Sequence, residues 1–463
     1  TRMQMAKLSA DSIESINKIQ DIDEFTVESL EADLDKLVEE YKEEMALLGV
    51  ETMQVEIPDP KKTVFRVMYP LRLERVGADL SWNDSTPLYN RRGWRLKEGE
   101  NIRVSVRTWM KIEDILAFSA EPVYYHNKYD SDALFEEGYF KLQYKEVEFA
   151  FGRSSMWWGP GYRGSLILSD NIVPLDSVKI KNTKPFYLPG KLKNIGGWDA
   201  AYFFSELSSN RIIKNAKLRS YRINLYPLSN LDLGYSKIVM LGGDREGSSL
   251  DAGDVFRALF YLNENEASQA DNNQISAFDL VYRMNNLGKY LKIIDNLVSY
   301  AQYGFDGEED CGFSNPAYLA GLYSADIFRV PGLSLRSEYA NTDTKGSHVW
   351  YSHGKYQSGY THQGSNIGHH MGGDADDLFF RLEKNTFFSN KVSLALEYSR
   401  QRRGLSIDNT EIRNRYGMEL SLFKTDIVEC IFGYFFERID NLANINDKRA
   451  SNHIFEISAK VEF

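Results

Sequence analysis

The feature that most constrains this chain is an alternation of apolar and polar residues that continues to its last position. In the C-terminal stretch FEISAKVEF, one face of an extended strand carries Phe455, Ile457, Ala459, Val461 and Phe463, and polar residues occupy the other face. Because side chains alternate across a strand, a period of two places one row in an apolar medium and the other in a polar one. That apolar medium is either a protein core or lipid.

The same period recurs from about residue 62 onward. It is found in RINLYPLSNLDLGYSKIVML (222–241), DLFFRLEK (377–384), KVSLALEYSR (391–400) and VECIFGYFFERI (428–439). The first of these predicts two strands joined by a tight turn at Leu228 to Asn230, and a helix is expected only near DAGDVFRALFYL (251–262). At about 20–25 residues for each barrel strand with its connections, the region holds about 16–20 strands.

The apolar medium is interpreted as lipid because of the aromatic strand ends and the terminal strand with its final Phe463, and a large soluble β-sandwich or stacked sheets stay the alternative. The chain has no run of about 18 apolar residues, which excludes a transmembrane helix, but a spanning strand needs only about 10 alternating residues. Aromatic residues make up 13% of the chain and gather at strand ends, as membrane interfaces require. Tight turns alternate with long loops rich in Gly, Asp and Asn. Since lipid offers no partner to an unpaired backbone group, we expect the last strand to close an outer-membrane barrel.

Residues 1–55 follow a different period and predict a periplasmic helical region ahead of a barrel at 60–463. Val27, Leu30, Leu34 and Leu37 recur at spacings of three and four, opposite an acidic face. Such a helix either docks on the rest of the protein or forms a short coiled coil. The opening TRMQMAKL resembles the end of an S-layer-homology-like repeat, which implies attachment to the cell wall. Its abrupt start leads us to expect a processed or incomplete N-terminus.

Composition and motifs argue against several other classes of protein. A net charge of −11 without a strongly basic block argues against a nucleic-acid partner. Cys311 and Cys430 are too few for a disulfide framework and pair only if the fold brings them together. The sequence contains no GxSxG motif and no P-loop, and a glycosidase pair cannot be picked out from 66 acidic residues. We therefore expect neither an enzyme nor a cofactor.

The most distinctive segment is FGRSSMWWGPGYRGSLILSDNIVPLD (151–176). Its glycines argue against a continuous strand and predict a loop that holds two indoles and a guanidinium close together. Aromatic faces stack on sugar rings, while Arg, Asp and Asn bond to hydroxyl and acid groups. The alternative is an inward loop that plugs the lumen. The candidate residues for polysaccharide binding or for a lumen loop are Trp157, Trp158, Tyr162, Arg163, Asp170 and Asn171.

A second loop concentrates histidine and aspartate. Five of the seven histidines fall within 23 residues, near Asp376 and Asp377: His348, His353, His362, His369 and His370. A metal site is one interpretation, but the loop has no HExxH motif and no ligand spacing on a helix. We expect hydrogen bonds within a folded loop and no metal, and a weak divalent-cation role bridging acidic sugars stays open. The candidates from this loop for the polysaccharide-binding or lumen-loop role are Tyr360, His362, His369 and Asp374.

Several segments, in one order, resemble the Wzi family of capsule-assembly outer-membrane proteins. They are MWWGPGYRGSLILSDN (156–171), GGDREGSSLDAGDVFRALF (242–260), NNQISAFDLVYR (272–283), YAQYGFDGEEDCG (300–312), PAYLAGLYS (316–324) and YQSGYTHQGSNIGHHMGGDADD (356–377). The resemblance spans about residues 60–463. It implies an all-β transmembrane barrel of 18 antiparallel strands with a closed lumen and periplasmic helices. It also implies a lectin-like role, in which the protein holds capsular polysaccharide at the cell surface.

The expected partners are therefore surface or capsular polysaccharide and outer-membrane lipid. Three other functions stay as alternatives. The barrel could be an open porin or solute channel, or the N-terminal helices could tether the outer membrane to peptidoglycan or another wall polymer. An acidic, aromatic-lined lumen would also suit an enzyme that acts on lipid or glycan.

Overall fold

A computed structural model of the chain describes residues 72–85, 93–94, 96–112, 115–244, 273–307, 316–344, 349–387, 392–422 and 427–463. All of them lie in the second of the chain's two units, Tyr69–Phe463. The helices predicted for residues 1–55 and 251–262 lie outside the described residues, as do Cys311 and His348. The predicted helical region at residues 1–55, and with it the predicted division into two domains, therefore stays a prediction. Cys430 is a free thiol.

The wall of the barrel is one antiparallel sheet. The sheet has 19 strands, of which β7 (Phe186–Tyr187) only extends the pairing at the end of β8, so 18 strands form the wall. Their bounds are β1 (Arg72–Asn83), β2 (Gly99–Ile112), β3 (Leu116–Asn127), β4 (Ser131–Tyr144), β5 (Val147–Ser154), β6 (Leu175–Asn182), β8 (Gly197–Glu206), β9 (Lys217–Leu228), β10 (Leu231–Leu241), β11 (Asn273–Met284), β12 (Leu297–Asp306), β13 (Pro316–Ser324), β14 (Leu333–Asn341), β17 (Ala375–Phe387), β18 (Val392–Arg403), β19 (Glu411–Leu422), β20 (Val428–Asp440) and β21 (Ala450–Glu462).

The remaining elements are short and lie in connections. β15 (Thr361–His362) and β16 (Ser365–Asn366) form a separate hairpin inside a loop. Four 3₁₀ turns are found among the described residues: η1 (Gly190–Ile195), η2 (Leu287–Lys289), η4 (Ile327–Arg329) and η5 (Leu442–Asn444). None of the helices in the described part of the chain has the length and apolar character needed to cross a membrane.

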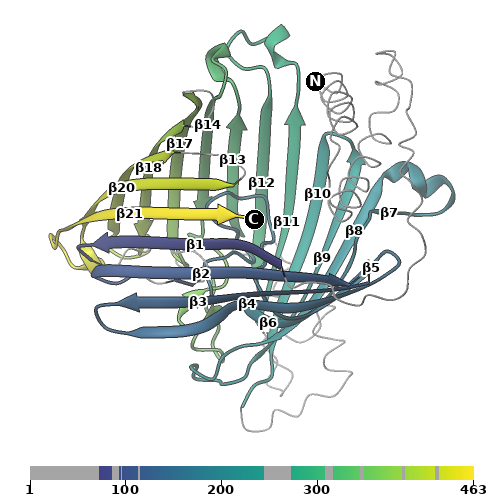
Figure 1. Ribbon diagram of the computed structural model, residues 1–463, viewed down its shortest axis with the longest axis horizontal. Coiled ribbons are helices and arrows are strands. Elements are labelled where there is room, and N and C mark those ends of the chain that lie inside the picture. The colour runs from purple at the N-terminus through teal and green to yellow at the C-terminus, as the bar shows by residue number, and fades with distance from the viewer. Residues whose placement is uncertain are drawn as a thin grey trace. The chain divides into compact units, whose positions relative to one another are not determined.

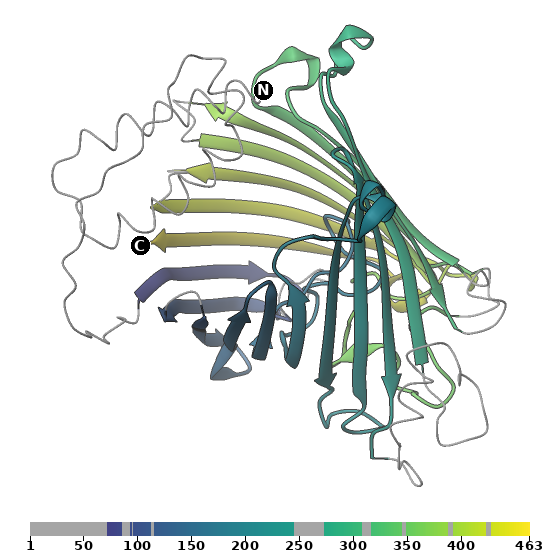
Figure 2. The same cartoon turned by 90° about the vertical axis from the view of Figure 1, so that its right-hand side faces the viewer.

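The first and last strands close the sheet, as predicted from the C-terminal stretch. β1 pairs with β21 in an unbroken antiparallel register from Arg75–Glu462 to Asn83–Ile454. The two strands lie side by side in both ribbon views, although they are hundreds of residues apart in the chain (Figures 1 and 2). Closure pairs the backbone groups that an edge strand would otherwise expose to hydrocarbon.

Connections differ at the two ends of the barrel. The short-turn end includes the two-residue turns 145–146 and 229–230, and the second of these confirms the tight turn predicted between β9 and β10. The long-loop end includes the connections 155–174, 207–216, 242–272 and 342–374. Short turns at one end and long loops at the other are the pattern of outer-membrane barrels.

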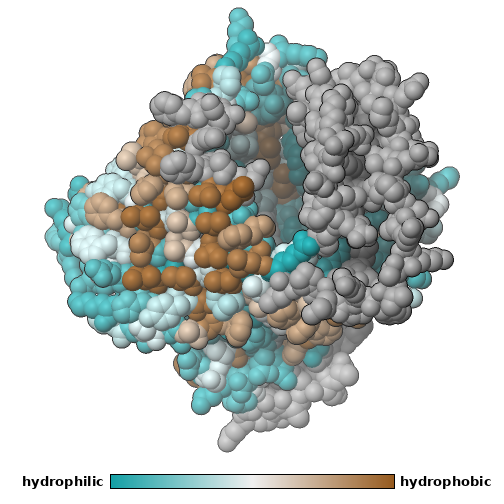
Figure 3. Space-filling model, in the orientation of Figure 1, coloured by the Kyte–Doolittle hydropathy of each residue, from teal (hydrophilic) through white to brown (hydrophobic). Residues whose placement is uncertain are grey.

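The outward face of the strands is apolar. At the C-terminus, Phe455 and Ile457 point out of the barrel and are 49% and 43% exposed, whereas Glu456, Ser458 and Lys460 line its interior. Figure 3 shows a band of hydrophobic residues over β20, β21 and β1, bounded at the left of the view, where these strands reach the long-loop end, by hydrophilic residues. The alternation of apolar and polar residues in the C-terminal strand therefore separates the outer surface from the lumen.

Part of the interior is a packed protein core. Buried side chains of the wall, among them Phe203, Leu218, Ile238, Met240 and Leu319, contact buried side chains of two connections, 155–174 and 342–374. Leu166, Ile167 and Ile367 from these connections have no exposed surface. The two connections thus fold into the barrel and fill one side of it.

Candidate functional site: the plugged lumen

The connection between β5 and β6 is a compact turn inside the barrel. The Trp158 amide donates a hydrogen bond of 2.9 Å to the Leu168 carbonyl, and these two residues form an isolated antiparallel bridge. Between them the chain reverses through Gly161, where a Cβ atom would lie 2.0 Å from the carbonyl oxygen of Gly164. Only glycine allows this close approach. The glycine-rich run therefore folds as an inward loop, which is the alternative interpretation of this segment.

Two polar residues of the wall hold this turn. The Gln302 side-chain oxygen accepts the Leu166 amide at 2.8 Å. The Glu338 carboxylate accepts the amides of Tyr162 (2.6 Å) and Arg163 (3.0 Å) and the Tyr300 hydroxyl (2.8 Å). Burying a backbone amide without a partner is costly, so these two side chains make an irregular turn tolerable inside the barrel.

The connection between β14 and β17 packs onto the same turn. The hydroxyls of Tyr351 and Tyr360 each donate at 2.9 Å, to the carbonyls of Leu166 and Ile167 respectively. Their rings stack with centroids 5.6 Å apart. Burial raises the pKa of both phenols, so both keep the proton that makes them donors. We call residues 155–174 and 349–374 together the plug.

Further bonds fasten the two halves of the plug to each other and to the wall. The Ser169 hydroxyl donates to the Gly368 carbonyl at 2.6 Å, and the Asn171 amide donates to the Asn366 carbonyl at 2.9 Å. From the connection between β8 and β9, the Arg211 guanidinium donates to the carbonyls of Thr361 and Gly359. The lumen is therefore blocked on this side by hydrogen-bonded and apolar contacts rather than by a loosely packed loop.

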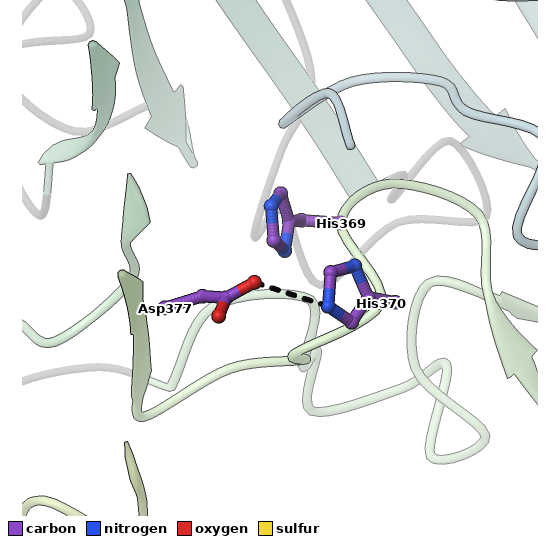
Figure 4. Close-up of side chains that lie close together, drawn as sticks. All are labelled: His369, His370 and Asp377. Atoms are coloured by element: carbon purple, nitrogen blue, oxygen red, sulfur yellow. Dashed lines mark ion pairs between the residues drawn. The ribbon is translucent and has the colours of Figure 1, made fainter. Parts of the chain in front are cut away.

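Two histidines and an aspartate meet at the base of the plug (Figure 4). His370 Nε2 lies 3.1 Å from an Asp377 carboxylate oxygen, and the His369 and His370 rings stack at 4.4 Å. Burial lowers the pKa of both imidazoles, which are therefore neutral. Arg163 Nε approaches the same Asp377 oxygen at 3.4 Å. Arg163 thus supplies the positive charge that this buried carboxylate needs.

This cluster also has the residue types of a metal site. Ligand atoms of His369, His370 and Asp377 lie within 4.8 Å of one another. A cation there would have to displace or repel the guanidinium of Arg163, and the Met371 amide approaches His369 Nδ1 at 3.3 Å, which favours a proton on Nε2. The hydrogen-bonding interpretation fits this geometry better, and the absence of a metal stays a prediction.

The candidate residues predicted from the sequence divide into two groups. Some are buried in the plug: Trp158, Asn171, Tyr360, His362 and His369. The others are partly exposed: Trp157, Tyr162, Arg163, Asp170 and Asp374. The role of all ten residues in binding polysaccharide stays a prediction.

A cavity of about 370 Å³ lies beside the plug. Tyr162 and Arg163 line it from the plug, and Trp94 and Phe379 add aromatic surface. Its other lining residues include charged groups of both signs on the wall strands: Arg75, Asp79, Arg103, Glu136, Glu397, Arg415, Glu419, Glu456 and Lys460. The volume lies within the range of small-ligand sites, which combine aromatic surface with a few polar groups.

The wall residues that position the plug are not among the residues predicted from the sequence. Gln302, Glu338 and Asp306, which accepts the Tyr351 amide at 2.7 Å, are inward-facing polar residues in strands. Their only signal in the sequence is a polar residue at an inward position close to a long loop. That signal is shared by the many lumen residues of any barrel, so it cannot single out three of them.

A closed 18-stranded antiparallel barrel with an apolar outer surface and a plug on one side of its lumen is an outer-membrane β-barrel with a plugged pore. Residues 74–453 match the family model described as "Capsule assembly protein Wzi". The chain belongs to this family.

Two other proteins show how far the likeness extends. The structure of Wzi from Escherichia coli, described as an outer-membrane carbohydrate-binding β-barrel involved in group 1 capsule assembly, superposes with a TM-score of 0.64 at 18% identity over 84% of each chain. OpdL of Pseudomonas aeruginosa superposes with a TM-score of 0.50 at 10% identity, over 84% of this chain and 98% of its own. Both likenesses concern the fold.

A curated relative matches a shorter region. A Klebsiella pneumoniae protein, described as an uncharacterized 55.8 kDa protein in the cps region, is 27% identical over 179 residues, or 37% of this chain. The chain spans about a third of the length of that relative.

Proposed function

We propose that this protein binds capsular or surface polysaccharide and holds it at the cell surface, acting by binding and without catalysis. Family membership supports this proposal, as does the carbohydrate binding described for the Escherichia coli barrel of the same fold. The observation that carries it is the plug, which fills one side of the lumen with a packed core and so argues against an open solute channel.

The proposed contacts come from the partly exposed candidates. Tyr162 and Arg163 line the cavity, where the ring of Tyr162 stacks on that of Phe379 with centroids 5.7 Å apart and the Arg336 guanidinium lies 4.3 Å from the Tyr162 ring centroid. These contacts hold the Tyr162 ring in place at the cavity wall. Trp157 is half-buried, and its indole nitrogen donates to the Gly159 carbonyl at 3.1 Å, which orients its face. A rigid indole is suited to stack on a sugar ring.

The test measures binding of the full chain to purified capsular polysaccharide in detergent. We expect Trp157→Ala to weaken binding about tenfold, because an aromatic stack contributes about 0.5–1.5 kcal/mol beyond its buried area. Tyr290→Ala is the matched control, since this aromatic ring is 85% exposed in a connection at the short-turn end. Equal affinity of the two variants would contradict the assignment of Trp157. Absence of binding by the unaltered protein would contradict the function itself.

The channel alternative is tested separately in planar bilayers. A plugged barrel gives no stable ohmic steps, whereas a solute channel gives them. The tether alternative depends on residues 1–55, which lie outside the described residues, and on peptidoglycan as a partner. Sedimentation with peptidoglycan, with and without residues 1–55, is the corresponding experiment.

A further inference from the structure

Above the apolar band, the outward face of β18–β20 carries a row of hydrogen-bond donors. Cross-strand pairing places Arg400 opposite Asn414, and Asn414 opposite Arg438. Since neighbouring strands lie about 4.8 Å apart, the two arginines start about 10 Å from each other, on either side of the asparagine. All three residues occupy the same face of the sheet because their partners are in direct register.

The row immediately nearer the middle of the barrel shows which face this is. Phe380, Tyr398, Tyr416 and Phe436 pair in succession across β17–β20. Tyr416 is 52% and Phe380 41% exposed, although both lie in the middle of a closed wall. They therefore point out of the barrel, as an interfacial aromatic belt does, and the donor row lies one step beyond them toward the long-loop end.

The N–H groups of these three side chains are available to donate hydrogen bonds on the outer face of the barrel. The Tyr398 hydroxyl donates to Asn414 Oδ1 at 3.1 Å, which occupies the amide oxygen and leaves the Asn414 NH₂ group as the outward polar atom. Arg400 is exposed and makes no ion pair or hydrogen bond with another residue of the described ranges. Arg438, with a 58% exposed side chain, reaches Asp440 only at 3.4 Å.

The arginine nearest to this row on the same strand is not available in the same way. Arg402, two residues beyond Arg400, is bound by Asp376 through bonds of 2.9 and 3.1 Å and a third, shorter one. That guanidinium is already neutralised. Arg400 has no carboxylate partner among the described residues, and Arg438 has only the longer contacts with Asp440, so both guanidinium groups can still bind an anion outside the barrel.

We propose that Arg400, Asn414 and Arg438 form a binding site for the phosphate group of a phosphorylated outer-leaflet glycolipid. Long loops of such barrels face the cell exterior, so the row lies at the depth of the outer-leaflet head groups, just above the aromatic belt. Guanidinium groups bind phosphate in a bidentate manner, and the amide adds a donor between them. A polysaccharide chain is a poorer fit, because the site faces the lipid side of the wall.

The test is native mass spectrometry of the full chain in detergent, titrated with diphosphoryl lipid A or with the same lipid after phosphatase treatment. We expect the unaltered protein to retain the phosphorylated lipid and to lose it when the phosphates are removed. Arg400→Gln and Arg438→Gln are each expected to weaken retention about fivefold, and the double variant about 25-fold, from about 1 kcal/mol for each arginine at a membrane surface.

Arg329→Gln is the matched control, because this arginine is exposed in the connection at the short-turn end. It is expected to retain lipid as the unaltered protein does. Asn414→Asp, which puts a negative charge between the arginines, is expected to weaken retention at least as much as either single arginine change. Thermal unfolding of each variant reports whether it is folded.

Three results would overturn the proposal: no retention by the unaltered protein, equal retention by the double variant, or indifference to the phosphates. Loss of polysaccharide binding by the double variant, with lipid retention unchanged, would assign the row to the glycan instead. Failure of the polysaccharide experiment above leaves this one unaffected, because the two use different residues and different ligands.

Discussion

The two sides of the barrel interior are built from the same alternating strands but hold different contents. On the side of β8–β14, apolar inward residues such as Phe203, Ile238 and Leu319 pack against the plug. On the side of β1–β4 and β17–β19, inward residues are charged and pair with each other across strands. Pairing of the strands closes the wall on all sides, whereas the pore is blocked only where apolar inward residues pack against the plug.

The charged side is held by arginine–carboxylate networks. Glu121, whose side chain is fully buried, accepts from Arg75 at 2.6 Å and from Arg107 Nε at 2.9 Å. On β17–β19, Arg381 pairs with Glu397 and Glu419. Such networks keep a polar wall rigid without filling it, so the cavity persists beside the plug.

The largest effect is expected from a substitution that places a charge on the apolar side of the barrel interior. Ile167→Asp buries an unpaired carboxylate at a fully buried position in the plug, which costs more than about 4 kcal/mol. We expect the plug to leave its site while the wall stays closed, so that conductance steps appear in planar bilayers. Ile407→Asp, at a position 50% exposed in the connection between β18 and β19, is the control. A silent bilayer with a folded Ile167→Asp barrel would mean that the apolar contacts do not keep the pore shut.

The next largest effect is expected on the charged side of the barrel interior. Glu121→Ala leaves the guanidinium groups of Arg75 and Arg107 without their shared carboxylate, and we expect a loss of about 3–5 kcal/mol in the free energy of unfolding. Denaturant titration of the detergent-solubilised barrel measures it. Asp176→Asn, which breaks an exposed pair with Arg153 (2.7 Å), is expected to cost less than about 1 kcal/mol. Similar losses for both would show that the network does not act as a unit.

Acid is expected to destabilise the plug side. Burial lowers the pKa of His362 to about 4, and the pKa values of His369 and His370 are also lowered. Between about pH 4 and 6.5 the unfolded chain therefore binds more protons than the folded one, so stability is retained above pH 6.5 and falls as the pH decreases. For His362 alone the loss at pH 5 is about 2 kcal/mol.

Thermal unfolding from pH 8 to pH 5 measures this slope. We expect His362→Gln to make the loss of stability with falling pH smaller, whereas His126→Gln, at an exposed position near the end of β3, serves as the control. An unaltered slope in the His362 variant would show that its imidazole is solvated in solution.

The smallest effect is expected at the contact between the plug and the connection that joins β18 to β19. Asp374 accepts the Ser406 amide at 3.0 Å and the Ser406 hydroxyl at 2.7 Å. Asp374→Ala removes both bonds, and we expect a loss of about 1–2 kcal/mol in the free energy of unfolding. Asp408→Ala, at an exposed position of the same connection as Ser406, serves as the control in the same thermal assay. Equal thermal unfolding midpoints for the two variants would show that the bonds between Asp374 and Ser406 do not stabilise the protein.

Much of the wall could be predicted from the sequence. The period of two identified the strands, and the tight turn between β9 and β10 and the pairing of β21 with β1 were both found as expected. These features depend on local residue order and on the need to satisfy backbone groups in lipid. The candidate loop at 151–176 was also located, and its inward fold was one of two alternatives.

The partners of that loop were beyond prediction. Tyr351 and Tyr360 lie about 190 residues from the carbonyls that they bind, and Glu338 lies about as far from the amides of Tyr162 and Arg163. No local period links such positions, because a hydrogen bond through the lumen depends on which strands face each other across the barrel.

By itself, the sequence determined which residues alternate between lipid and lumen, since a strand has only two faces and the membrane tolerates apolar groups on one of them. Only the tertiary structure decided which lumen residues meet across the barrel, and hence that one side of it is plugged while the other keeps a charged cavity. The physical reason is that alternation is a property of one strand, whereas filling depends on distances between strands that the chain order does not contain.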